Sequence, residues 1–214
     1  MEGFMKGIFS VSEWLMRLMY VNILWIVFTL LGLVILGFFP ATTAMFAIVR
    51  RWVMKEELPV FKTFWTTYKS EFLKSNLLGL LIIVFGIFMY SNIKIVEATT
   101  VPLLKLVYIP NVICILIYSL TLLYIFPVFV HFDVGLKDVV KNAIVLMTVN
   151  PIATFTMAVL TSLFYFILYQ FPGLIPFFSG SVPAFLLMFF CSHVFTKILH
   201  EQKGKGLRGS ETPI

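Results

Sequence analysis

Four long runs without a charged residue constrain this chain more than any other feature of its sequence. A helix that crosses a bilayer needs roughly 20 consecutive apolar residues, and each run supplies about that number or more. Hydrophobic residues make up 60% of the 214 and charged residues only 12%, against averages of about 45–50% and 25% in soluble domains. The chain is therefore predicted to be an all-α integral membrane protein. The charge-free runs are 18–49, 75–93, 106–132 and 142–196.

This composition excludes a soluble enzyme, a disulfide scaffold and a nucleic-acid-binding domain. The formal net charge of +6 comes from basic residues that flank apolar runs, where they serve membrane orientation and meet anionic lipids. We therefore expect the lipid bilayer, and no nucleic acid, as a partner. Cys114 and Cys191 both lie inside predicted spans, and no closely spaced Cys or His set suits a metal. No cofactor is expected.

Turn residues divide the runs into five spans and a short sixth helix. Gly37 and Pro40 are expected to end the first span, and Pro172-Gly173 to separate two spans within the last run. Residues 41–57 form either a short returning or re-entrant helix or an interfacial helix outside the hydrocarbon core. The chain is expected to form a single polytopic domain over 1–199, followed by a mobile tail over 200–214. The expected spans are 18–39, 41–57 (short), 76–93, 106–130, 148–170 and 177–198.

Amphipathic stretches lie between or before these spans, at residues 4–17, 59–74 and 134–146. In 59–74 the aromatic residues are spaced four, three and four apart, which places them on one helical face, and lysines are interleaved with them. Such a pattern is typical of a helix on the membrane surface. A docking surface for a cytosolic partner is the alternative. The aromatic residues are Phe61, Trp65, Tyr68 and Phe72.

The distribution of Lys and Arg predicts the orientation in the membrane. If 41–74 is a loop, 12 of the 16 cationic residues fall on one side; if 41–57 returns through the membrane, 14 do. The positive-inside rule assigns that side to the cytoplasm. Both arrangements place the C-terminus in the cytoplasm, and the second, which we favour, also places the N-terminus there. A multi-pass protein of a cell membrane is expected.

No catalytic set of residues is visible, so we do not expect an enzyme. An ion-coupled pump is also disfavoured, because coupling sites need intramembrane charges and the long spans have none. His131 and Asp133 are interpreted as a capping and hydrogen-bonding pair, in preference to a proton-responsive one. Neutral polar residues inside the spans either bond between helices, the favoured interpretation, or line a path for an uncharged solute. They include Asn22, Thr42, Thr43 and Asn76.

Several of these residues fall in a pattern that resembles the YesL family of small bacterial membrane proteins of unknown function. The most specific part is the block Pro40-Ala41-Thr42-Thr43-Ala44, and softer matches follow after the third span. The resemblance covers nearly the whole chain and implies a bacterial neighbourhood of sugar-uptake and polysaccharide-degradation genes. It carries over no active residues. The other matching residues are Asn22, Trp25, Gly32, Gly37, Arg50, Trp52, Asn76, Phe132, Asp133, Lys141, Asn142 and Ala143.

Two functions follow as hypotheses. The first is an accessory component of carbohydrate uptake or utilisation that contacts a sugar ABC transporter or another membrane protein. The second is a small permease or channel for a neutral solute such as a sugar, in which the Asn and Thr side chains form the lining.

The orientation is testable with reporter fusions. A fusion at residue 100 is expected to read as external and one at residue 205 as cytoplasmic, because both arrangements place these points on opposite sides. A cytoplasmic signal at residue 100 would contradict both arrangements.

Overall fold

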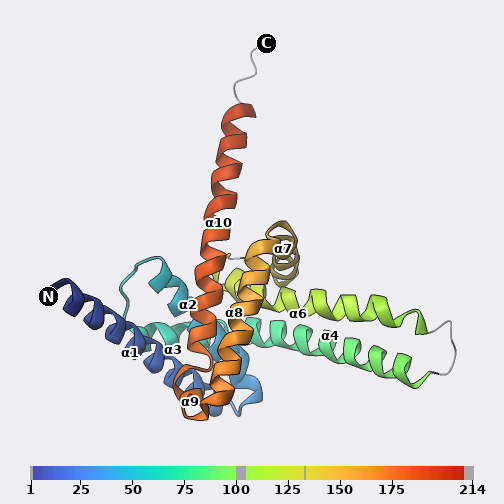
Figure 1. Ribbon diagram of the computed structural model, residues 1–214, viewed down its shortest axis with the longest axis horizontal. Coiled ribbons are helices and arrows are strands. Elements are labelled where there is room, and N and C mark those ends of the chain that lie inside the picture. The colour runs from blue at the N-terminus through green and yellow to red at the C-terminus, as the bar shows by residue number, and fades with distance from the viewer. Residues whose placement is uncertain (1, 100–104, 133, 210–214) are drawn as a thin grey trace.

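The chain forms helices almost throughout. The computed structural model describes residues 2–99, 105–132 and 134–209, with side chains for 9, 11–99, 105–132 and 134–196, and contains no strand in these ranges. Figure 1 shows their arrangement. The elements are α1 (Glu2–Leu31), α2 (Ile35–Val53), α3 (Val60–Ser70), α4 (Phe72–Ala98), α6 (Tyr108–His131), α7 (Leu136–Val149), α8 (Pro151–Gln170), the 3₁₀ turn η1 (Pro172–Leu174), α9 (Ile175–Phe178) and α10 (Ser181–Gly209).

Within the described residues, four helices are long and apolar enough to cross a membrane. A fifth span is present if Pro172–Phe178 and Ser181–Thr196, which are bent by 58° at their junction, are counted together. Large apolar side chains are widely exposed on these helices, as expected where lipid replaces water as the solvent. The prediction of an all-α membrane protein is confirmed. The four are Val11–Leu31, Phe72–Ala98, Tyr108–His131 and Pro151–Gln170.

Helix α2 lies at the centre of the protein. It packs against α1, α3, α4, α6 and α10, and its side chains at Ala41, Ala44, Ile48 and Val49 are fully buried. The sequence predicts only a short piece over 41–57 here. The observed helix of 19 residues has a length of about 28 Å at 1.5 Å per residue. The small and weakly polar residues over 41–44, which lower its hydropathy, are buried against neighbouring helices together with larger apolar side chains such as Phe46 and Trp52.

The expected boundary of the first span is wrong. Helix α1 already ends at Leu31, and the chain reverses through a tight turn in which Leu33 and Val34 have positive φ of 56° and 65°. Gly37 instead permits a close approach, because a Cβ there would lie 2.4 Å from the Thr29 carbonyl oxygen. Pro40 lies inside α2. The amphipathic stretch over 4–17 is continuous with the span as one helix.

Helices α4 and α6 form an arm that extends away from the other helices (Figure 1). The Tyr118 hydroxyl donates to the Ile82 carbonyl oxygen at 2.8 Å, which ties the two helices together. The arm runs crosswise to α8 and α10 in Figure 1.

The last third of the chain differs from its expected spans mainly at helix ends. Residues 148–150 complete α7 and its connection, so α8 begins at Pro151. The last span, expected over 177–198, is divided between α9 and α10. Helix α10 continues to Gly209, whereas the sequence predicts a mobile tail from residue 200. Residues 210–214 lie outside the described residues.

The glycine contact between α1 and α2 predicts a specific loss of stability. Gly37→Val is expected to lower the free energy of unfolding by about 1–3 kcal/mol through overpacking, because the gain in helix propensity is under about 1 kcal/mol. Thermal unfolding in detergent measures the effect. Gly173→Val is the control, since nothing lies within 4 Å of a Cβ there. Equal stability of the two variants would contradict the packing role of Gly37.

Candidate functional site

Asn22 on α1 joins the first helix to the break between α9 and α10. Its Nδ2 donates to the Pro176 carbonyl oxygen at 2.8 Å. Its Oδ1 accepts from the backbone N–H groups of Gly180 at 2.9 Å and Ser181 at 3.0 Å. The side chain is fully buried. One amide therefore satisfies three backbone groups that the broken helix leaves without helical partners, which matters where no water can replace them.

Trp25 and Thr42 join α1 to α2. The indole Nε1 of Trp25 donates to Thr42 Oγ1 at 3.0 Å, and the Thr42 hydroxyl donates in turn to the Phe38 carbonyl oxygen at 2.7 Å. Both polar groups are thus paired inside the protein. Since a hydroxyl has one proton to donate, the Thr42 proton is committed to Phe38.

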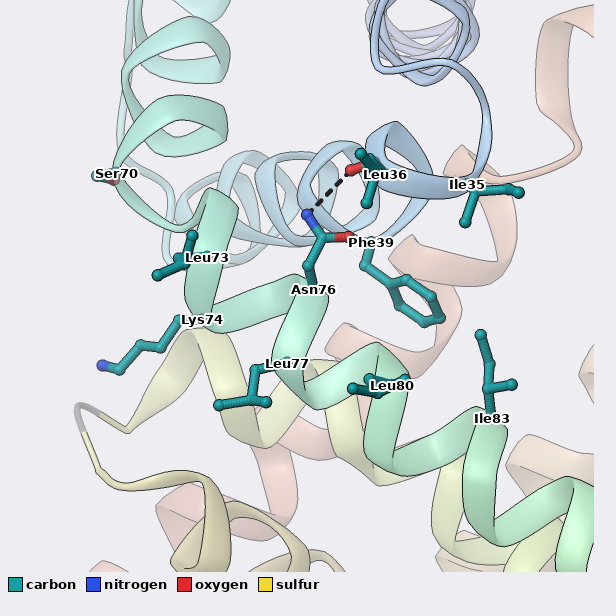
Figure 2. A pocket seen from close by; sticks show the side chains of 10 residues that line it. All are labelled: Ile35, Leu36, Phe39, Ser70, Leu73, Lys74, Asn76, Leu77, Leu80 and Ile83. Carbon is teal, nitrogen blue, oxygen red and sulfur yellow. Dashed lines mark hydrogen bonds between the residues drawn. The ribbon is translucent and has the colours of Figure 1, made fainter.

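Pro40 and Asn76 form a third link, between α2 and α4. A proline has no N–H, so Pro40 leaves the carbonyl four residues earlier, that of Leu36, without its helical donor. Asn76 Nδ2 donates to this Leu36 oxygen at 3.0 Å (Figure 2) and also to Phe72 in its own helix at 2.8 Å. Asn76 on α4 therefore supplies the donor that Pro40 removes from α2.

The remaining sequence-predicted residues have less specific places. Ala41 and Ala44 are fully buried in the core, where their small side chains let neighbouring helices approach. Asn142 is half-buried on α7. Asp133 lies outside the described residues, so its expected pairing with His131 is not tested.

A polar cleft opens where α2 and α6 end and α4 begins. It has a volume of about 360 Å³. Arg50 Nε donates to His131 Nδ1 at 3.2 Å across it, and Glu71 and Lys74 line the opposite side. Thr43 also lines the cleft; its side chain is 1% exposed, and its hydroxyl has no hydrogen-bond partner among the described residues. A ligand with polar atoms could supply that partner.

The sequence does not predict this cleft. Arg50 belongs to the family pattern, and Lys74 is the last residue of the amphipathic stretch over 59–74. The residues come from three helices that are far apart in the sequence. The available signal is that Arg50, Lys74 and His131 all lie at or beside the ends of charge-free runs, on the side that the charge distribution assigns to the cytoplasm.

The described residues offer little for catalysis or metal binding. They contain no group of three or more His, Cys, Asp or Glu side chains that could hold a metal ion. Cys191 is buried, with its Sγ 4.0 Å from Met157 Sδ, and Cys114 is exposed on the apolar arm. That the chain is not an enzyme stays a prediction.

The family model that matches this chain covers the region that contains the block from Pro40 to Ala44. The sequence model of DUF624, described as a protein of unknown function, matches residues 18–93. Three uncharacterized proteins of Bacillus subtilis (strain 168) are similar over most of their length. YteU is 37% identical, covering 95% of this chain and 90% of the relative. YesV is 34% identical, with 92% and 97% covered, and YesL is 36% identical, with 85% and 86% covered. No solved structure matches the chain.

The link between Pro40 and Asn76 is testable with a double-mutant cycle. Asn76→Ala is expected to lower the free energy of unfolding of the wild type by about 1 kcal/mol. In a Pro40→Ala background the new N–H occupies the Leu36 oxygen, so the same substitution is expected to cost less.

Asn92→Ala is the matched control, because Asn92 also lies on α4 but bonds only to Phe88 of its own helix. Its effect should be the same in both backgrounds. Additive effects of Pro40→Ala and Asn76→Ala, with no coupling energy, would contradict the link.

Proposed function

We propose that this chain, which belongs to the DUF624 family of proteins of unknown function, is a non-enzymatic accessory component of carbohydrate uptake or utilisation in a bacterial cell membrane. One observation carries the accessory role. Three intramembrane polar side chains of the motif are bonded to other helices: Asn22 to Pro176, Gly180 and Ser181, Trp25 to Thr42, and Asn76 to Leu36. The carbohydrate assignment rests on the family resemblance.

The same observation weighs against a permease for a neutral solute. A permease needs polar groups that exchange hydrogen bonds with a passing solute, and its path must remain open between helices. The centre of this protein, around α2, is instead packed with buried side chains such as Phe46, Ile48 and Tyr124. The permease therefore becomes an outcome of the experiment below.

The outer face of α3 provides a surface for a protein partner. Its inner face packs on α1, where Phe64 lies 5.0 Å from Phe28 between ring centroids. Phe61 and Trp65 border this contact, with ring centroids 6.3 Å and 5.4 Å from that of Phe28, yet they remain 55% and 39% exposed. The Lys69 ammonium lies 4.1 Å from the centroid of the Trp65 ring. Exposed aromatic rings with interleaved lysines suit a partner with acidic and apolar groups. We propose the membrane subunits of a sugar ABC transporter as that partner.

The arrangement of helix ends supports a cytoplasmic position for this face. The ends of α2 and α6 meet around one cleft, so the connections that follow these two helices lie on the same side. These connections carry much of the positive charge, which favours the cytoplasm. The C-terminus is proposed to lie on that side as well.

Deletion of the gene tests the proposed role. The bacterium that carries the chain should take up a labelled oligosaccharide more slowly after deletion, with glucose uptake unchanged.

The double substitution Lys62→Glu and Lys69→Glu is expected to reduce co-purification of the sugar transporter's membrane subunits, whereas Lys55→Glu, outside α3, should not. Oligosaccharide flux through liposomes that contain this chain alone would contradict the accessory role and establish the permease.

A further inference from the structure

Two cavities of opposite character meet at Lys74, near the beginning of α4. The polar cleft described above lies on one side of this residue. An apolar groove between the beginning of α2 and the first half of α4 lies on the other, and Lys74 lines both. A polar and an apolar cavity joined in this way match the two parts of an amphiphile.

The apolar groove has a volume of about 660 Å³. Figure 2 shows Lys74 at one end, beside Leu73, and Ile83 toward the other, with Leu77 and Leu80 between them. Leu77 and Leu80 are 51% and 55% exposed, so the groove is open to its surroundings. Because α4 is a candidate membrane span, those surroundings include lipid chains.

The polar cleft carries side chains that suit one particular kind of group. Arg50 and Lys74 line it together with Glu71. The Arg50 bond to His131 uses one of five guanidinium N–H donors. Arginine and lysine are the side chains that bind phosphate oxygens best. The oxygens of a phosphodiester can accept hydrogen bonds from the remaining Arg50 donors.

We propose that the groove and the cleft together bind one molecule of an anionic phospholipid with a hydroxylated headgroup. An acyl chain lies along Leu77 and Leu80 in the groove. The phosphodiester lies between Arg50 and Lys74, and a headgroup hydroxyl bonds to Glu71. This site does not depend on a role in carbohydrate uptake.

The aliphatic part of the Lys74 side chain suits such a site. Lysine side chains lay their methylene groups along apolar surface and hold the ammonium at the polar boundary. Lys74 therefore contacts both parts of one lipid. The cleft lies at the ends of α2 and α6, where headgroups are expected, and the groove follows α4 into the span.

Native mass spectrometry of the purified full chain tests the headgroup. The protein is incubated with phosphatidylglycerol or with phosphatidylcholine that has the same acyl chains. One phosphatidylglycerol is expected to be retained per chain, with at least about tenfold preference over phosphatidylcholine. Arg50→Gln and Lys74→Gln are each expected to reduce retention about tenfold. Arg51→Gln, the exposed neighbour outside both cavities, should retain the lipid.

A second pair of variants tests the groove without changing charge. Leu80→Trp fills the groove and is expected to abolish retention of phosphatidylglycerol. Leu81→Trp adds the same bulk on another face of α4, beside Cys114 and Ile117 of the arm, and should leave retention unchanged. Circular dichroism of every variant establishes that the helices remain folded, and Lys74→Gln tests the headgroup if Arg50→Gln unfolds.

Three results would overturn the proposal. Equal retention of the two lipids would remove the headgroup assignment, and equal losses in Arg50→Gln and Arg51→Gln would remove the cleft. Displacement of the lipid by millimolar glycerol 3-phosphate, with the same binding of this soluble phosphate to Leu80→Trp, would identify the site as one for a free phosphate ester.

Discussion

The fold around α2 depends on how one backbone carbonyl is satisfied. Pro40 deprives the Leu36 oxygen of its helical donor, and inside a membrane an unpaired carbonyl costs several kcal/mol because water is absent. Asn76 supplies the donor from α4 at 3.0 Å. The proline therefore creates a requirement on α2 that a second helix must meet, and α4 is held in register as a consequence.

Polar side chains also bond to backbone groups in the last third of the chain, at the junction of α9 and α10. The Ser179 carbonyl oxygen there accepts from the Tyr165 hydroxyl of α8 at 3.3 Å. Asn22 then satisfies three further backbone groups at the α9–α10 junction. At Pro40 and at the α9–α10 junction, backbone groups without a helical donor or acceptor are thus bonded to an asparagine of a different helix. This pairing explains why Asn22 and Asn76 are engaged inside the protein.

Sequence patterns predict part of this architecture and miss the rest for physical reasons. Hydropathy locates α4, α6 and α8 within a few residues, because burial in lipid acts on each helix separately. It misplaces the α1–α2 turn, because Gly37 resembles a helix breaker until its packing against Thr29 is known. The cleft of Arg50, Lys74 and His131 is missed for a similar reason: its residues meet only in three dimensions. The most specific motif block, around Pro40, is in contrast correctly singled out and lies on the central helix.

The central claim is that the polar motif residues hold helices together. The most direct test is the free energy of unfolding of Asn22→Ala, measured in detergent beside Asn92→Ala, whose side chain bonds only within its own helix. Because Asn22→Ala leaves the Pro176 carbonyl and two backbone N–H groups unpaired, it is expected to lose about 1–3 kcal/mol, and Asn92→Ala less than about 0.5 kcal/mol. Equal stability of the two variants would contradict the claim.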